Sequence, residues 1–293
     1  MKRPKILLTG ANGQVGWELQ RSLSSLGDVV AFDSQGLNLT DAAKLGEGLK
    51  LVAPDIIVNA AAYTAVDKAE SETEKAHAVN AVAPGIMAEE AARSGALLIH
   101  FSTDYVFDGS GVAPWREDDT CNPLNVYGRT KLAGERLIQS SGCRHLIFRT
   151  SWVYGARGSN FLLTMRRLMR ERTELKVVAD QIGAPTWCRD LAEATAQILS
   201  QLVARPDHPH SNPWGIYHMS NAGETSWHGF AQAIRDLIPD EMCALKQLIA
   251  IPGTEYPTPA QRPQNSRLDN SKLQNAFGLQ LQHWHSALKL CMG

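Results

Sequence analysis

The sequence near the N-terminus reads Lys5-Ile-Leu-Leu-Thr-Gly-Ala-Asn-Gly-Gln-Val-Gly16. The apolar run predicts a buried strand, and leucines at helical spacing predict a helix over residues 17–26. Glycines at positions 10, 13 and 16 permit a tight turn and a close approach of backbone to a pyrophosphate, which the N-terminus of the following helix favours. A glycine triplet alone is a weak signal, but its place between a strand and a helix predicts a dinucleotide site.

Short apolar runs alternate with helical segments over the first 150 residues. Further strands are expected at 29–32, 56–58, 97–101 and 145–148, and helices at 41–52, 70–94 and 127–139. This alternation predicts an α/β fold of the Rossmann type, in which helices cover both faces of a doubly wound parallel sheet.

The pattern loosens after residue 150, where we expect helices at 160–172, 191–202, 226–237 and near the C-terminus. Strands are expected at 175–179 and 215–219, and surface loops at 205–213 and 252–265. We therefore predict a dinucleotide-binding domain over residues 1–150. Residues 151–293 are expected to form a smaller α/β part that binds mainly substrate, and whether it interleaves with the first domain stays open.

Charge and composition restrict the partners. The net charge is −1, so no global field favours nucleic acid or an anionic membrane. No apolar run approaches the ~20 residues of a membrane span, and the N-terminal one is too short for a signal peptide. Five scattered cysteines suit free thiols. We expect a cytoplasmic protein that acts on a small molecule.

Asp33 follows the second predicted strand, where a carboxylate would meet the ribose of a bound dinucleotide. A carboxylate there repels a 2′-phosphate, which favours NADH, although Asp33 could turn away. Both NADPH and NADH therefore stay open as cofactors.

Tyr127 and Lys131 stand four residues apart in a predicted helix, on one face of it. A nearby ammonium lowers the pKa of a tyrosine, and such a tyrosine can exchange a proton with an alcohol or ketone. A surface helix in which a lysine happens to follow a tyrosine is the alternative.

Four motifs in order, Gly10-x-x-Gly-x-x-Gly16, Asn59-Ala-Ala-Ala62, Ser102-Thr-Asp-Tyr105 and Tyr127-x-x-x-Lys131, resemble the extended short-chain dehydrogenase/reductase family. The first and last occur throughout that family. The stretches that carry a closer resemblance, to its nucleotide-sugar reductases, are 65–70, 102–107, 123–128, 131–135, 148–154, 180–186 and 262–267.

The resemblance implies reduction of the C4 ketone of dTDP-4-dehydro-L-rhamnose by NADPH or NADH, giving dTDP-L-rhamnose for surface polysaccharide. Tyr127 would donate the proton. Lys131 would lower the pKa of Tyr127 and bind the nicotinamide ribose, and the Thr103 hydroxyl would hydrogen-bond the ketone oxygen.

Other binding residues follow from the same resemblance. The cofactor residues are Gly10, Gly13, Gln14, Val15 and Gly16 at the pyrophosphate, Asp33, Asn38 and Leu39 at the adenosine half, and Ala61, Ala62 and Tyr63 after the third strand, with Tyr127 and Lys131. The substrate residues are Thr103, Asp104, Trp152, Arg262, Asn265 and Arg267. Trp152 could equally be a core aromatic. The two arginines suit a diphosphate, because guanidinium groups pair with phosphate oxygens.

Some relatives hold Mg²⁺ at a dimer interface, where Glu18 matches one ligand position. Arg189 stands where a second carboxylate is expected, and a cation opposes Mg²⁺ there, so we expect no metal and leave monomer and homodimer open. A dehydratase would need a second carboxylate at Tyr105. An epimerase of the same fold, or a regulatory subunit that binds cofactor without turnover, stays as an alternative.

Overall fold

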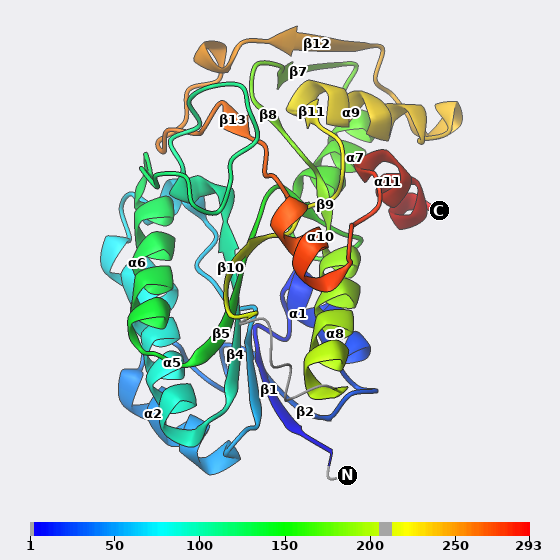
Figure 1. Cartoon of the computed structure of the whole chain (residues 1–293). Coiled ribbons are helices and arrows are strands. Elements are labelled where there is room, and N and C mark those ends of the chain that lie inside the picture. Colours follow the sequence, from blue (N-terminus) through cyan, green and yellow to red (C-terminus); the bar gives the residue numbers. More distant parts are fainter. Residues whose placement is uncertain (1–2, 205–212) are drawn as a thin grey trace.

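The computed structural model describes residues 3–204 and 213–293, and a six-stranded parallel sheet forms its centre (Figure 1). The strands lie in the order β10-β5-β4-β3-β1-β2. Their bounds are β1 Lys5–Thr9, β2 Asp28–Phe32, β3 Ile56–Asn59, β4 Leu97–Thr103, β5 Arg144–Thr150 and β10 Gly215–His218.

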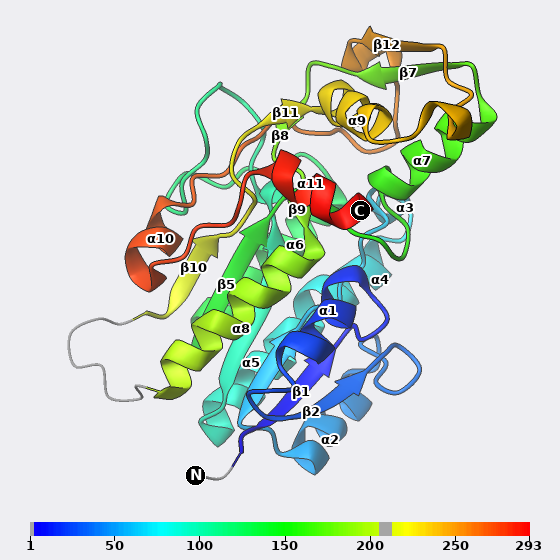
Figure 2. The same ribbon diagram turned by 90° about the vertical axis from the view of Figure 1, so that its right-hand side faces the viewer.

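Helices cover both faces of this sheet, as the two views show (Figures 1 and 2). One face carries α1 (Gln14–Ser22) and α8 (Cys188–Ala204), and the other carries α2 (Ala42–Val52), α5 (Ala83–Ser94) and α6 (Val126–Ser140). Successive strand residues serve opposite faces, since Ile6 and Leu8 join the core under α1 while Leu7 joins the core under α2. The expected doubly wound α/β fold is confirmed.

The strand order reverses beside β1, which pairs with β2 on one side and β3 on the other. In doubly wound sheets the ligand crevice opens outside the carboxyl ends of the strands at such a point. Here that point lies between the loops that follow Thr9 and Asn59. The chain thus brings the glycine loop beside residues 60–63.

A smaller part lies beyond the carboxyl edge of the sheet (Figure 1). Its helices α7, α9 and α11 share one apolar core. The elements of this part and the segments that join it to the sheet are β6 Val153–Tyr154, α7 Phe161–Glu171, β7 Glu174–Val178, β8 Ile182–Gly183, β9 Thr186–Trp187, β11 Thr225–Ser226, α9 Trp227–Asp236, β12 Gln247–Ile251, β13 Asn265–Ser266, α10 Ser271–Phe277 and α11 Trp284–Met292. Three short 3-10 turns are Asp104–Val106, Asp240–Met242 and Gly253–Glu255.

Two expected helices differ from the structure. The first begins at Gln14 and ends at Ser22, because the glycine loop leads directly into it. The expected helix over 70–94 is divided into α3 (Val66–Ala69), α4 (Thr73–His77), the π-helical turn η1 (Ala78–Val82) and α5. The wide turn places Asn80, whose side-chain amide binds both backbone groups of Tyr63 at 2.8 and 3.1 Å.

Two elements from beyond residue 150 complete the central layers. Strand β10 pairs with β5, and α8 packs against α1. The sheet therefore contains strands from both parts of the chain. The assignment of cofactor binding to residues 1–150 and of mainly substrate binding to residues 151–293 stays a prediction. Most of the expected loop at 205–213 lies outside the described residues. Within residues 3–204 and 213–293, no helix combines the length and apolar character that a membrane crossing needs.

Candidate active site

The glycine loop shows why glycine occupies two of its three positions. Gly10 has φ +76°, and a Cβ there would lie 2.8 Å from the backbone of Ala60 and Ala61. A Cβ on Gly16 would lie 2.0 Å from the Gly10 carbonyl oxygen. Gly13 differs, because a Cβ there would meet only that oxygen, at 3.2 Å. Gly13, at the N-terminus of α1, is thus the least crowded of the three glycines.

The N-terminus of α1 is suited to an anion. Its N-cap is Gly13, which offers no side-chain cap, and its first turn holds no acidic residue. The N–H groups that begin a helix carry a partial positive charge and need acceptors. Gln14 turns its side chain outward, where its Oε1 accepts a hydrogen bond from Asn160 Nδ2 at 2.7 Å. These features fit a dinucleotide pyrophosphate against Gln14, Val15 and Gly16.

Asp33 lies beside this loop. Its Oδ1 accepts hydrogen bonds from the backbone N–H groups of Gln35 and Gly36 at 3.0 and 2.9 Å, and its Oδ2 accepts one from Asn12 at 2.8 Å. The two backbone N–H groups hold the pKa of Asp33 below its usual value. Asp33 is therefore a fixed carboxylate next to the glycine loop.

The other expected adenosine contacts follow Asp33. Asn38 is exposed, and its Oδ1 accepts hydrogen bonds from the Thr40 amide and hydroxyl at 3.0 and 2.9 Å. Leu39 is half-buried against the core under α2. Ala61, Ala62 and Tyr63 follow β3 and are half-buried at the crevice.

Tyr127 and Thr103 meet at the carboxyl edge of the sheet. Asn125 caps α6, with its Oδ1 accepting a hydrogen bond from Gly128 N at 2.8 Å, so Tyr127 stands in the first turn. Thr103 ends β4, and its hydroxyl donates to Asp104 Oδ1 at 3.1 Å. The Tyr127 phenol lies close to this hydroxyl, which acts to lower the pKa of Tyr127 against the effect of burial. Hydroxyl and phenol therefore face one point, as an acid and a carbonyl partner must.

The expected effect of Lys131 on Tyr127 is wrong for the chain without cofactor. Burial raises the pKa of Tyr127 to about 12, and the nearby Asp104 adds to the rise, while the Thr103 hydroxyl opposes it. Lys131 Nζ instead lies 2.7 Å from the Phe101 carbonyl oxygen, to which it donates. Desolvation of the phenol outweighs the effect of Lys131 on its pKa, because the Lys131 side chain is directed toward β4.

Asp104 is buried beside this pair. Burial raises its pKa to about 6, against hydrogen bonds from Ser266 and Thr103. Its Oδ2 has no hydrogen-bond partner among the described residues. A buried carboxylate oxygen without a donor fits a ligand hydroxyl.

Trp152 has a backbone conformation that side chains rarely adopt, with φ +49°. Its indole stacks on Trp227, with ring centroids 3.6 Å apart and planes 10° apart. A Cβ on Gly183 would lie 2.7 Å from the same indole. Residues held in sparsely populated backbone conformations cluster at active sites and ligand clamps. The sequence did not single out Trp227.

The three expected residues of the 262–267 loop have partners within the chain. Arg262 forms a bidentate pair with Asp67 at 3.1 and 2.9 Å. Arg267 pairs with Glu224 at 2.6 and 3.3 Å. Asn265 is buried and donates to the Ala113 carbonyl at 2.8 Å. Neither arginine is a free cation, so a diphosphate would compete with a carboxylate at each.

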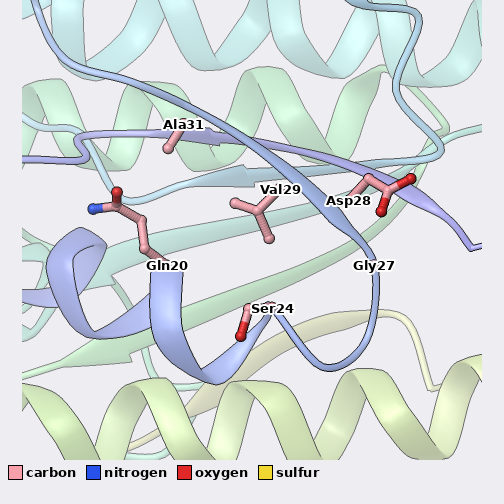
Figure 3. A pocket seen from close by; sticks show the side chains of 6 residues that line it. All are labelled: Gln20, Ser24, Gly27, Asp28, Val29 and Ala31. Carbon is pink, nitrogen blue, oxygen red and sulfur yellow. The ribbon is translucent and has the colours of Figure 1, made fainter.

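A cavity of about 860 Å³ lies between α7, β7 and residues 253–264. Trp227, Phe161 and Arg262 line it, which places it next to Trp152. Its size suits a small ligand. A hollow on the outside of α1 and β2 is lined by none of the expected site residues (Figure 3).

The region of Glu18 does not favour a cation. Arg189 Nε lies 3.3 Å from Glu18 Oε2, so the one carboxylate that matches a metal ligand is already paired. Among the residues that the structure describes, no group of three or more histidine, cysteine, aspartate or glutamate side chains could hold a metal.

A family model described as the RmlD substrate binding domain matches residues 4–293. The chain belongs to this family. The dTDP-4-dehydrorhamnose reductase of Burkholderia thailandensis is 48% identical over 292 residues, which cover 98% of each chain. A dTDP-4-dehydrorhamnose reductase of Bacillus anthracis, solved in complex with NADP, has TM-score 0.88 and 36% identity over 99% of each chain. The spore coat polysaccharide biosynthesis protein SpsK of Bacillus subtilis is 41% identical, over 97% of this chain and 95% of that protein.

Membership of the RmlD family confirms the resemblance inferred from the sequence. The structure adds residues that sequence reasoning missed. Trp227, Asp67 and Glu224 contact the expected substrate residues Trp152, Arg262 and Arg267, respectively. His100 contacts Lys131, and Asn59 contacts His100. Only Asp67 and Asn59 lay in quoted motifs, so the sequence held a signal for these two alone.

Proposed function

We propose that this protein is an NAD(P)H-dependent oxidoreductase that reduces the C4 ketone of dTDP-4-dehydro-L-rhamnose to dTDP-L-rhamnose. The observation that carries the proposal is the placement of Thr103 at the end of β4 and of Tyr127 in the first turn of α6, both at the carboxyl edge of the sheet. The full-length similarity to a dTDP-4-dehydrorhamnose reductase supports the choice of ketone. The similarity to SpsK supports a role in polysaccharide biosynthesis.

We assign the chemistry as follows. Bound NAD(P)H supplies the hydride. The Thr103 hydroxyl orients the ketone oxygen and stabilises the charge that develops on it. Tyr127 gives that oxygen a proton. Its raised pKa keeps the phenol protonated at neutral pH, and a proton donor must start in that state.

The substrate side rests on the smaller part of the chain. We propose that Asp104 accepts a sugar hydroxyl and that Trp152 forms an apolar wall for the sugar. Arg262, Arg267 and Asn265 stay candidates for the diphosphate, with Arg262 favoured because it lines the cavity. The cofactor is NADPH or NADH: Asp33 opposes a 2′-phosphate, whereas a relative was solved in complex with NADP.

We also propose a cytoplasmic protein whose partner is a nucleotide sugar. All five cysteines are free, which suits a reducing compartment. The net charge of −1 favours neither nucleic acid nor a membrane surface.

The test is an NAD(P)H oxidation assay on a panel of 4-keto nucleotide sugars. We expect turnover with dTDP-4-dehydro-L-rhamnose. Tyr127→Phe should lower kcat by roughly 10²- to 10⁴-fold and leave the Kd for NADPH unchanged. Tyr217→Phe removes another phenol, on β10, and should match wild type. Turnover without added NAD(P)H would instead indicate an epimerase, and cofactor binding without any turnover would indicate a regulatory subunit.

A further inference from the structure

A line of buried polar side chains crosses the sheet and ends at Lys131. Thr9 Oγ1 on β1 donates to Asn59 Oδ1 on β3 at 2.6 Å. Asn59 Nδ2 lies 3.0 Å from Nδ1 of His100 on β4. His100 Nε2 lies 3.0 Å from Nζ of Lys131 on α6. All four side chains are buried.

The direction of each hydrogen bond in this line follows from one backbone group. Ala61 N–H donates to Asn59 Oδ1 at 3.2 Å, and a backbone N–H can only donate. The Asn59 oxygen therefore faces Ala61, and its NH₂ group faces His100. An NH₂ group is also only a donor, so His100 Nδ1 must accept. A neutral imidazole with an unprotonated Nδ1 carries its proton on Nε2.

The Nε2–H of His100 then points at Lys131. An ammonium has three N–H donors and no lone pair, whereas the neutral amine has one. Only the amine can accept from His100 while it donates to the Phe101 carbonyl oxygen at 2.7 Å. The four bonds then run in one direction, from Thr9 to Phe101.

We propose that His100 is a positioning residue that acts through Lys131, favouring its neutral amine and directing it toward β4 in the chain without cofactor. The inference rests on the proposed function only in treating Lys131 as part of the catalytic group. It goes beyond that function because it makes the protonation state of Lys131 depend on His100 of β4.

The surroundings of Lys131 agree with this assignment. Burial lowers the pKa of Lys131 to about 8, and the charge of Glu135, one turn along α6, opposes the shift. Glu135 is itself paired with Arg149 of β5, which weakens its effect on Lys131. Burial holds the pKa of His100 well below its usual value, so the imidazole is neutral.

The remaining titratable groups near Lys131 are Tyr127 and Asp104. Tyr127 stands one turn back on α6, and Asp104 of the following 3-10 turn influences Tyr127. Neither contributes to the shift of Lys131. The charge of Lys131 is thus governed by burial, Glu135 and the hydrogen bond from His100.

Protonation of Lys131 has a structural cost in this arrangement. An ammonium would donate to His100 Nε2, so the ring proton would move to Nδ1 and face the Asn59 NH₂ group. The clash is relieved only if the Asn59 amide turns over, which removes the acceptor of Ala61 N–H. The charge of Lys131 is therefore linked to the backbone at Ala61, where we expect the cofactor.

The first test measures the His100 tautomer in the wild-type chain without cofactor, by long-range ¹⁵N–¹H correlation at a pH above the Lys131 pKa of about 8. The resonance is assigned by its loss in His100→Asn. We expect a proton on Nε2 and none on Nδ1. A proton on Nδ1 overturns the proposal, and this readout does not depend on any variant folding well.

The second test titrates the ¹³Cε resonance of Lys131, assigned with Lys131→Met, again without cofactor. His100→Asn keeps an oxygen for the Asn59 NH₂ group and removes the donor to Nζ. We expect the pKa of Lys131 to rise by roughly one unit, since a hydrogen bond contributes about 1 kcal/mol. Asn59→Asp should also raise it, because a carboxylate draws the ring proton to Nδ1.

The matched control is His218→Asn, which removes another buried histidine, on β10, without touching Lys131. Its Lys131 pKa should equal that of wild type. An unchanged pKa in His100→Asn, or an equal change in both variants, overturns the proposal. Neither test uses turnover, so a failure of the proposed function in the ketone assay leaves both results interpretable.

Discussion

Removing one member of the buried Glu135–Arg149 pair should destabilise the protein more than removing both. Arg149 Nε lies 3.0 and 3.2 Å from the two Glu135 oxygens, and its Nη2 lies 2.7 Å from Oε2. The Arg149 and Glu135 side chains are 2% and 0% exposed, respectively. The Ser102 hydroxyl also donates to Glu135. This network fixes β4 to β5 and α6 directly behind Thr103.

The magnitude follows from the burial. Loss of one partner leaves an uncompensated charge without water, which costs about 3–5 kcal/mol, whereas apolar replacement of both is often neutral. A chain of 293 residues has an unfolding entropy of about 0.6 kcal/mol/K near its Tm, so each single variant should lose roughly 5–8 °C. Glu135→Leu and Arg149→Met should each show this loss. The double variant should regain most of it.

The assay is urea unfolding monitored by circular dichroism, with thermal scans alongside, on all four members of the cycle. Arg144→Met is the control, because Arg144 lies on the same strand but is exposed, and its loss should change the free energy of unfolding by about 0.5 kcal/mol or less. The reasoning would be refuted if the stability losses of the two single variants added up in the double variant. It would also be refuted if each single variant lost no more stability than the control.

Three further predictions concern the site. Gly16→Ala should unfold the glycine loop and lower Tm. Gly13→Ala should keep Tm within a few degrees, because its Cβ meets only one atom, and should weaken NADPH binding at least roughly tenfold by fluorescence titration. Wild-type affinity in Gly13→Ala would contradict this. The pKa of Asp104 is raised to about 6 from 3.8, so its ionisation costs the folded state stability as pH rises between about 4 and 6. Asp104→Asn should therefore gain stability relative to wild type, by roughly 2–3 kcal/mol above pH 6 in urea unfolding, and a pH-independent difference would refute it. Trp227→Ala should remove the support of Trp152 and raise KM for the keto sugar more than it lowers kcat, and an unchanged KM would show that the stack has no part in binding.

Local patterns were sufficient for the sheet and for part of the site. The alternation of Ile6, Leu7 and Leu8 between two cores is a property of any strand, and it is visible in the sequence as a continuous apolar run. The glycine loop needs only neighbours along the chain. The place of Tyr127 in the first turn of α6 is also local, since Asn125 caps that helix.

Pairings between distant segments could not be predicted in this way. Arg262 and Asp67 are 195 residues apart, and no spacing rule relates them. The same holds for Trp152 and Trp227, whose stack depends on how the smaller part closes over the sheet edge. Single residues therefore supported only a diphosphate ligand for Arg262, and either a substrate contact or a core aromatic for Trp152.

The sequence by itself determined the strands, the glycine loop and the order of the catalytic motifs, because these follow from periodicity and short-range backbone sterics. Tertiary structure decided the electrostatics of the site. Helical spacing placed Lys131 on the same face as Tyr127, but packing against β4 turned its Nζ toward His100 and Phe101. The pKa of Tyr127 rose because desolvation depends on all surrounding atoms, and those come from segments far apart in the chain.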